Sequence, residues 1–295
     1  MIKEIKSKSV LNKHKKRDSL FLEDYTLNPY LGCSFNCLYC YVNGSKYGSR
    51  IPKNLSVKIN AAEVLYRQLK NRARKKEYGI IALGSATDPY LHQEKELKIT
   101  RELLKIIYRF HFPLNLSTKS NLILRDMDLL KKIDESAKLP EDLATRLGKG
   151  TIITFSFSTM DNEMARIFEP AAPSPLDRLE AMAQLKTEGF LVGVCLMPIL
   201  PFLSDTPDQI DFIIKTVKEF GGDFVLSGGM TLFGDQCNDS RMKYYDALAE
   251  YFPEVLTKTK AIFDNSDYPP PYYQKKISDL TSEICRKYNI KSRII

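Results

Sequence analysis

Three cysteines lie close together in the segment CSFNCLYC. Cys33, Cys37 and Cys40 have a C-x3-C-x2-C spacing, whereas the other three cysteines of the 295-residue chain are scattered. A disulfide framework spreads its cysteines through a shorter secreted chain, so this clustering indicates a metal site in a reducing compartment such as the cytoplasm. Thiolate ligands favour zinc, copper(I) or an iron–sulfur cluster.

This group of thiols has no evident fourth ligand. A structural zinc site closes with four ligands, usually as two separated pairs, and the chain has no second CxxC pair and only isolated histidines. A [4Fe–4S] cluster normally takes four cysteines. Three cysteines would leave one iron open to bind something other than protein. The plainer alternative is three buried or incidental cysteines, but clusters this tight in an intracellular chain usually bind metal.

The elements that must position this motif alternate between strand and helix. Helical periodicity is expected near 57–77, 96–110, 125–137, 174–189 and 206–222, with a last helix near 274–288. Apolar strand segments are expected near 25–32, 79–86, 113–119, 151–158, 190–199 and 223–229. Ser174 and Thr206, each followed by proline, are expected N-caps. Such alternation predicts an α/β fold with parallel strands, in six units that are too few for a closed eight-stranded barrel.

The composition is that of an ordinary globular protein, with 43% hydrophobic and 27% charged residues. No apolar run approaches the roughly 20 residues of a membrane-spanning helix, and the first residues lack the apolar region of a secretory signal. The net charge is +8, but residues 1–17 alone hold seven basic residues and one acid. We expect a basic N-terminal arm over 1–20, which either binds phosphate backbones or is a solvated, partly disordered tail.

Polar side chains recur where the expected strands end. Thr87 follows the second strand, Lys119 follows the third, and Ser156 alternates with buried phenylalanines on the fourth. In βα barrels the chemistry lies at these carboxyl ends of the strands. A zwitterionic ligand needs such a lining, with hydroxyls and a lysine for its carboxylate and apolar surface for an adenine ring.

The segment LNPYLGCSFNCLYCY resembles the cluster-binding loop of the radical S-adenosylmethionine (radical SAM) superfamily. Over about 25–234 the chain resembles its spore photoproduct lyase-like (DNA repair photolyase-like) branch, in the stretches GSATDPY, STKSNLILRD, FSFSTMD and RIFEPAAPSPLDRLEAMAQLKTEGFLVGV. The resemblance implies an open partial TIM-type (β/α)6 barrel over 21–234, with a C-terminal helical extension over 235–295 that packs on the barrel.

The resemblance also implies a cofactor set and the residues that hold it. Cys33, Cys37 and Cys40 would hold a [4Fe–4S] cluster whose fourth iron binds the amino and carboxylate groups of S-adenosylmethionine. The positions that match the branch as S-adenosylmethionine contacts are Tyr39, Thr87, Lys119, Ser156, Met197 and, more weakly, Arg178. Arg178 has the alternative of a helix-surface arginine.

The implied reaction is radical chemistry on an unidentified substrate. A flavodoxin- or ferredoxin-like donor supplies an electron, S-adenosylmethionine is cleaved reductively, and the resulting 5′-deoxyadenosyl radical abstracts a hydrogen atom. The branch and the basic arm suggest a nucleic-acid substrate, and no membrane is involved.

One position departs from the branch. True spore photoproduct lyases carry a hydrogen-donating cysteine where this chain has Ser85, whose O–H bond is too strong to replace a thiol. Tyr41 and Cys237 are the candidate catalytic residues that remain. The rival interpretations are a non-catalytic, metal-dependent nucleic-acid-binding module and a maturation or electron-transfer scaffold.

Overall fold

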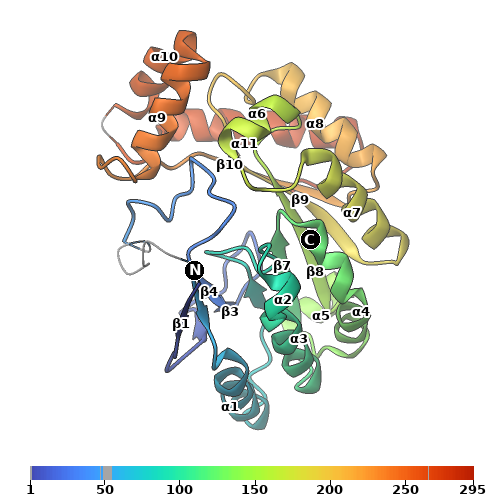
Figure 1. The fold of residues 1–295 in the computed structure, drawn as a ribbon. Coiled ribbons are helices and arrows are strands. Elements are labelled where there is room, and N and C mark those ends of the chain that lie inside the picture. The colour runs from blue at the N-terminus through green and yellow to red at the C-terminus, as the bar shows by residue number, and fades with distance from the viewer. Residues whose placement is uncertain (1, 47, 49–54, 265) are drawn as a thin grey trace.

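A seven-stranded sheet forms the centre of the computed structural model, which describes residues 2–46, 48, 55–264 and 266–295 (Figure 1). The strand order is β10-β9-β8-β7-β6-β3-β2, and every neighbouring pair is parallel except β3 with β2. The six parallel strands are β3 (Tyr25–Leu27), β6 (Ile81–Leu83), β7 (Leu114–Thr118), β8 (Thr151–Phe157), β9 (Leu191–Ile199) and β10 (Phe224–Gly229). The strands and helices form the predicted open partial barrel, and the parallel edge strand β10 is not paired with β3 or β2.

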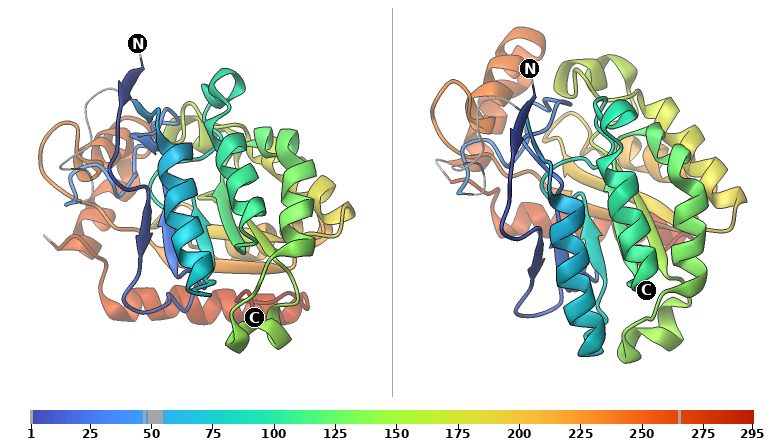
Figure 2. Two further views of the ribbon diagram at one scale, coloured as in Figure 1. Left: turned by 90° about the horizontal axis from the view of Figure 1, so that it is seen from below. Right: turned by 60° about the horizontal axis from the view of Figure 1, so that its bottom comes forward.

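Five longer helices connect these strands on the outer side of the sheet. They are α1 (Ala61–Arg74), α3 (Ile99–Arg109), α4 (Met127–Ser136), α7 (Pro175–Thr187) and α8 (Pro207–Glu219). Contacts between α1 and α3 and between α3 and α4 place these three helices side by side, as Figure 2 also shows. No helix in the described ranges is both long and apolar enough to cross a bilayer.

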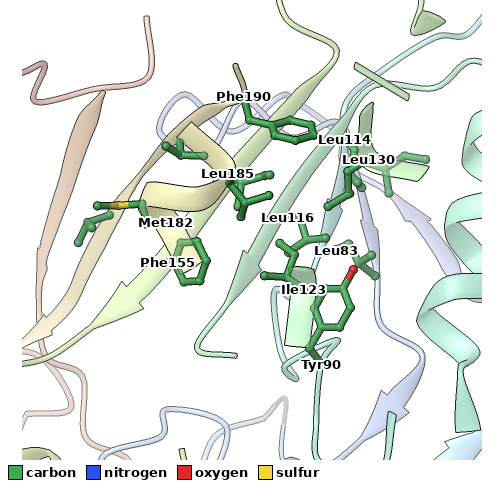
Figure 3. Close-up of a cluster of buried hydrophobic side chains, with 14 of the residues drawn as sticks. Leu83, Tyr90, Leu114, Leu116, Ile123, Leu130, Phe155, Met182, Leu185 and Phe190 are labelled. Atoms are coloured by element: carbon green, nitrogen blue, oxygen red, sulfur yellow. The ribbon is translucent and has the colours of Figure 1, made fainter. Parts of the chain in front are cut away.

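The main hydrophobic core lies between these helices and the sheet. Phe155 of β8 and Met182 and Leu185 of α7 are fully buried, and Figure 3 shows them facing one another across this layer. Burying a side chain of this size stabilises the fold by about 1.5–3 kcal/mol. This packing between helices and sheet therefore holds each strand, and with it the end of the strand, in a fixed position. The strand ends therefore form a rigid rim for a site.

The N-terminal segment is part of the structure rather than a detached tail. β2 (Leu11–Lys13) forms the antiparallel edge of the main sheet. β1 (Lys3–Ile5) joins a second, three-stranded sheet with β5 (Ser56–Lys58) and β4 (Tyr30–Leu31). The lysine-rich segment therefore runs along the barrel wall.

Shorter helices and a C-terminal group complete the fold. The short elements are α2 (Glu94–Leu97), the 3-10 helix η1 (Asn121–Asp126), α5 (Glu141–Leu147) and α6 (Asn162–Phe168). The C-terminal helices are α9 (Ser240–Tyr251), α10 (Pro253–Phe263) and α11 (Pro271–Lys287). α11 packs against β10 and α8, while α9 and α10 lie together at one end of the barrel (Figure 1).

The predicted caps are confirmed. The Ser174 side chain accepts a hydrogen bond from the amide of Asp177 in a complete capping box, and Thr206 accepts one from Gln209. The polar connection after α4 contains the unpredicted helix α5, and the tail after β10 contains α9 and α10.

Two predicted elements are divided in the structure. The expected strand 25–32 stops at Leu27, because Pro29 has no N–H for the ladder, and residues 30–31 pair in the second sheet instead. The expected helix 96–110 is broken at Lys98, whose backbone is left-handed with φ of 52°.

Candidate active site

The cysteine loop follows β4 directly and is fastened to a distant part of the chain. The amide of Leu38 donates to the carbonyl of Phe168 over 2.9 Å, and the amide of Ala171 donates to the carbonyl of Phe35 over 3.3 Å. These two bonds hold the loop against the segment between α6 and α7, which carries Glu169.

The three thiols are partly shielded from water and are surrounded by amide groups. Burial and the nearby Asp88 charge raise the pKa of Cys33 to about 12. Burial also raises the pKa of Cys40, while hydrogen bonds from the backbone amides of Val42 and Asn43 oppose that rise. Amide donors to sulfur are among the groups that tune cysteine-ligated iron–sulfur clusters. The loop thus has the chemistry of a cluster-binding loop.

The three thiols of the loop are near one another, but in the described structure they are not gathered around a single-ion site. In the part of the chain that the structure describes, no three His, Cys, Asp or Glu side chains are grouped to hold one metal ion. A single zinc ion would draw its sulfurs to about 2.3 Å from one centre. The charges of Cys33 and Cys40 nevertheless act on Cys37, so the three groups are near one another.

A buried carboxylate connects the loop to the strand ends. Glu169 accepts hydrogen bonds from the hydroxyl of Tyr39, from Ser158 Oγ over 2.9 Å and from the guanidinium group of Arg178. Its Oε1 also lies 3.7 Å from Lys119 Nζ. Glu169 is only 2% exposed, and Arg178 is only 1% exposed. Arg178 is therefore not the helix-surface arginine of the alternative interpretation.

The charges of this group balance one another. Burial opposes ionisation of Glu169, but Arg178 and Lys119 outweigh it and lower the pKa of Glu169 to about 2. Burial likewise opposes the charge on Lys119, yet Glu169 and Cys37 raise its pKa above the usual value. Lys119 is thus a buried ammonium group that keeps its charge, which is the group needed to bind a carboxylate.

Hydrogen bonds to neighbouring residues orient Lys119. Its backbone amide donates to Asp88 over 2.7 Å, and its Nζ donates to Ser156 Oγ over 2.7 Å. The same Nζ lies 5.9 Å from the centre of the Tyr39 ring. The structure therefore brings Tyr39, Lys119, Ser156 and Arg178, four of the six residues predicted to contact S-adenosylmethionine, into one network.

The fifth predicted contact, Thr87, has an unused hydroxyl. Thr87 is 4% exposed, and its Oγ1 has no hydrogen-bond partner among the described residues. Buried hydroxyls are normally satisfied, so a lone one at a strand end suits a ligand that supplies the missing partner. Gly84, with φ of 102°, makes the turn that leads to Thr87. Glycine is required there because a Cβ at this position would overlap the carbonyl of Ser117.

Met197, the sixth predicted contact, lies at the end of β9 against β10. A Cβ added at Gly228 would lie 3.0 Å from the Met197 sulfur, so glycine leaves room for this side chain. Its flexible thioether offers the apolar surface that the sequence predicts at this strand end.

The two candidate catalytic residues lie in different surroundings. The Tyr41 hydroxyl donates to the backbone carbonyl of Ser85 over 2.6 Å, so this tyrosine lies beside the position of the missing lyase cysteine. Cys237 is an exposed thiol in the loop between β10 and α9. No contact between Cys237 and Tyr41 is seen in the described structure.

Sequence reasoning missed Glu169, and it gave Asp88 and Ser158 no role beyond that of polar side chains at strand ends. Asp88 accepts hydrogen bonds from Thr118 Oγ1 and from the Tyr90 amide, both over 2.8 Å. Two signals were available, namely the acid directly before Pro170 and the strand serines that need a polar partner. Neither indicates that the acid would lie beside Tyr39, which is 130 residues away in the chain.

Known proteins match this chain in sequence over most of its length. The family model described as the Radical SAM superfamily matches residues 27–217. An uncharacterised protein of Mycobacterium tuberculosis is 27% identical over 294 residues, which cover 97% of this chain and 81% of that protein. An uncharacterised protein of Methanocaldococcus jannaschii is 30% identical over 203 residues, or 66% of each chain. A radical SAM Nα-GlyT isomerase of Pseudomonas phage M6 is 24% identical over 70% of this chain and 39% of its own length.

Solved structures of spore photoproduct lyase share the fold. A variant of that enzyme matches 97% of this chain and 78% of its own chain, with a TM-score of 0.67 and 14% identity. The same enzyme complexed with dinucleoside spore photoproduct matches with a TM-score of 0.63 over 94% of this chain and 76% of its own, again at 14% identity. The two non-catalytic alternatives are set aside by the family match, which spans most of the barrel. The chain therefore belongs to the radical SAM superfamily of enzymes, which use a [4Fe–4S] cluster and S-adenosylmethionine.

Proposed function

We propose that Cys33, Cys37 and Cys40 hold the [4Fe–4S] cluster and that the neighbouring strand ends hold S-adenosylmethionine, for radical chemistry on a nucleic-acid substrate. The observation that carries this proposal is the charged, buried Lys119 beside the cysteine loop, aimed by Ser156 and Asp88. When bound, the cluster and S-adenosylmethionine together supply a 5′-deoxyadenosyl radical that abstracts a hydrogen atom.

The chain's own residues divide the binding of the ligand between them. The Lys119 ammonium group would pair with the ligand carboxylate, and the free Thr87 hydroxyl would donate to one of its oxygens. Met197 would cover an apolar part of the adenosyl group. Arg178 already donates to Glu169, to the Ser156 carbonyl and to the Pro173 carbonyl, so we give it the role of positioning Glu169 rather than touching the ligand.

Glu169 allows the two cations Lys119 and Arg178 to be buried side by side. Without a carboxylate there, two positive groups would be buried within reach of each other. With it, the Lys119 ammonium group retains a free direction toward a ligand, because Glu169 and Ser156 satisfy only part of its three donors. Tyr39, held by Glu169, shields the same space from water.

After hydrogen abstraction, a hydrogen atom must return to the product radical. We assign this step to Tyr41, since its hydroxyl lies at the Ser85 backbone and Ser85 itself lacks a reactive hydrogen. The phenolic O–H bond would break as the product C–H bond forms. The tyrosyl radical left behind would take up one proton from solvent and one electron from the same flavodoxin- or ferredoxin-like donor. Cys237 is the second candidate donor, and its exposure would require the loop after β10 to close over the substrate.

The substrate class is proposed from two supports. Spore photoproduct lyase, whose fold this chain shares, is known in complex with a dinucleoside spore photoproduct. The chain also carries a strongly basic N-terminal segment. A flavodoxin- or ferredoxin-like protein would supply the electron. The six free cysteines agree with a reducing compartment, which we take to be the cytoplasm.

Anaerobic reconstitution tests the proposal. The protein should bind about four iron and four sulfide per chain, and the EPR spectrum of its reduced cluster should change when S-adenosylmethionine is added. Lys119→Met should keep the cluster and lose that spectral change, whereas Lys105→Met, an exposed lysine on α3, should behave as wild type. A cluster whose spectrum is indifferent to S-adenosylmethionine in the wild type would overturn the proposed ligand site.

A further inference from the structure

Two basic segments far apart in the sequence form one surface. Residues 1–17 carry seven basic residues and one acid, and residues 61–77, which include α1, carry six basic residues and two acids. Together these segments hold a charge of +10, which exceeds the +8 of the whole chain. The remaining chain is therefore slightly acidic, so the net positive charge of this protein comes from these two segments.

Side-chain amides fasten the two segments to each other. The Asn60 amide group exchanges hydrogen bonds with the backbone N–H and C=O of Ser7. Gln68, two helical turns farther along, accepts from the amides of Val10 and Leu11. Figure 2 shows the N-terminal segment running alongside α1 in both views. The basic residues of the two segments thus share one rigid wall of the barrel, not a loose tail.

Most of these cations point into solvent without a partner. Lys8 and Lys15 of the N-terminal segment and Lys70 and Lys75 of the helix region are exposed. In the described part of the chain, no ion pair is formed by any of these four ammonium groups, whereas Lys13 and Arg72 share Glu77. Unpaired like charges repel one another, so their concentration on one wall favours an anionic partner.

The basic wall leads to the candidate active site. β1 is separated from β4 by the single strand β5, and β4 ends at Leu31, two residues before Cys33. Two strand spacings amount to about 10 Å. From there the wall extends along the 14 residues of α1, a length of about 21 Å at 1.5 Å per residue. A chain of phosphates lying on it would reach the rim next to the cysteine loop.

We propose that this wall, formed by residues 2–17 and the exposed side of residues 61–77, is the docking surface for the phosphate backbone of a nucleic acid. The inference rests on the proposed nucleic-acid substrate and adds where that substrate is held. An elongated row of unpaired lysines matches a linear polyanion, and about 21 Å spans about six phosphates of one strand at 3.4 Å each. A compact acidic protein, such as the electron donor, would instead fit a rounder patch.

Fluorescence anisotropy with a fluorescein-labelled 20-nucleotide strand and its duplex tests this inference, without S-adenosylmethionine or reductant. The quadruple variant Lys8→Gln, Lys15→Gln, Lys70→Gln and Lys75→Gln should bind both probes at least about tenfold more weakly at 50 mM salt, and its salt slope should fall by about one per lost phosphate contact. In the double variant Lys8→Gln, Lys70→Gln, the salt slope should fall by about half as much as in the quadruple variant.

A matched control removes the same charge elsewhere. Lys132, Lys258, Lys260 and Lys276 are exposed on three other helices and, like the first four, form no ion pair in the described part of the chain. Changing all four to glutamine should leave affinity and salt slope as in the wild type. Equal weakening by the two quadruple variants would overturn the inference, because binding would then be diffuse. It would also be overturned if the first variant bound both probes normally but accepted electrons more slowly from an acidic flavodoxin.

The result of the probe-binding experiment can be distinguished from a failure of the proposed radical reaction. None of the four lysines contacts the cysteine loop or the strand-end network in the described structure, so the variant should still release 5′-deoxyadenosine at the wild-type rate. Lost probe binding with normal release supports the docking surface. Normal probe binding contradicts it, whatever the state of the reaction.

Discussion

The carboxylate of Glu169 lies 3.7 Å from the ammonium group of Lys119, and both side chains are almost fully shielded from water. Glu169 enters from the segment between α6 and α7, whereas Lys119 follows β7. Each charge would be unfavourable in that place alone. Their pairing, with Arg178 on the other carboxylate oxygen, allows a positive group to be kept beside the cysteine loop.

Removing this carboxylate should destabilise the protein. Glu169→Gln leaves the Arg178 and Lys119 charges buried without a counter-ion, and breaking a buried pair in this way is expected to lower the free energy of unfolding by about 3–5 kcal/mol. Urea unfolding of the metal-free protein, followed by circular dichroism, measures the change. Glu163→Gln, on the exposed side of α6, is the matched control and should be neutral. Equal unfolding midpoints for the two variants would contradict the role given to Glu169.

Thr87→Val separates ligand binding from stability. The Thr87 hydroxyl is buried without a partner in the described structure, so its loss should leave the unfolding free energy unchanged or slightly raised. If the hydroxyl donates to S-adenosylmethionine, affinity should fall about tenfold, which corresponds to about 1.4 kcal/mol. Anaerobic equilibrium dialysis measures this affinity.

The comparison variant for that experiment is Thr118→Val. Its hydroxyl donates to Asp88 over 2.8 Å, so this change should destabilise the protein by about 1–3 kcal/mol. The assignment of Thr87 fails if Thr87→Val is as destabilising as Thr118→Val and binds the ligand normally.

Gly84 should tolerate no side chain. Its φ of 102° and the carbonyl of Ser117 leave no room for a Cβ, so Gly84→Ala should lower the unfolding free energy by at least about 3 kcal/mol. Gly148 has φ of 61° with nothing within 4 Å of the place where a Cβ would lie, and Gly148→Ala should lose only about 1–2 kcal/mol. Thermal unfolding of the pair tests the difference, and equal losses would show that contact with Ser117 has no role.

As the pH rises from about 4.5 to 7, the free energy of unfolding should fall because Glu23 loses its proton. Burial, and then the like charge of Asp18, raise the pKa of Glu23 to about 7 from 4.5. The folded state therefore holds this proton more tightly than the unfolded state, and the resulting stability is full below pH 4.5 and is lost as the pH rises through 7. Glu23→Gln is neutral throughout and should be more stable than the wild type at pH 8, by up to about 3 kcal/mol.

Denaturant titrations at pH 5 and pH 8 check this prediction. Glu96→Gln, an exposed acid on α2, should keep the wild-type difference between the two pH values. A Glu23→Gln variant with an undiminished difference would locate the pH dependence elsewhere.

The sequence predicts the framework of the fold because each element has a strong local pattern. The parallel strands, the helices between them and the caps at Ser174 and Thr206 depend on periodicity and on residues that are neighbours in the chain. The division at Lys98 is not predictable in this way because a left-handed lysine has no local signature. Helices α9 and α10 were missed, and in α9 the reason is that the apolar side chains are spread around the helix instead of gathering on one face.

The site was predictable only where a motif or a strand end marked it. Cys33, Cys37 and Cys40 share one short segment, whereas Lys119 and Ser156 lie at strand ends, where the resemblance to the spore photoproduct lyase-like branch marks them as ligand contacts. Glu169 reaches the same place through loop bonds such as that from Leu38 to Phe168, which no spacing in the sequence reveals. Likewise, the amides of Asn60 and Gln68 that fasten the basic segment to α1 have no distinguishing local pattern.

The most direct test of the proposed radical chemistry is the release of 5′-deoxyadenosine by the anaerobically reconstituted, chemically reduced protein, measured by mass spectrometry. We expect release by the wild type and by Cys285→Ala, a buried cysteine of α11 outside the loop, and none by the Cys33→Ala, Cys37→Ala, Cys40→Ala triple variant. No release from a wild type that holds its full complement of iron, or equal release from the triple variant, would contradict it.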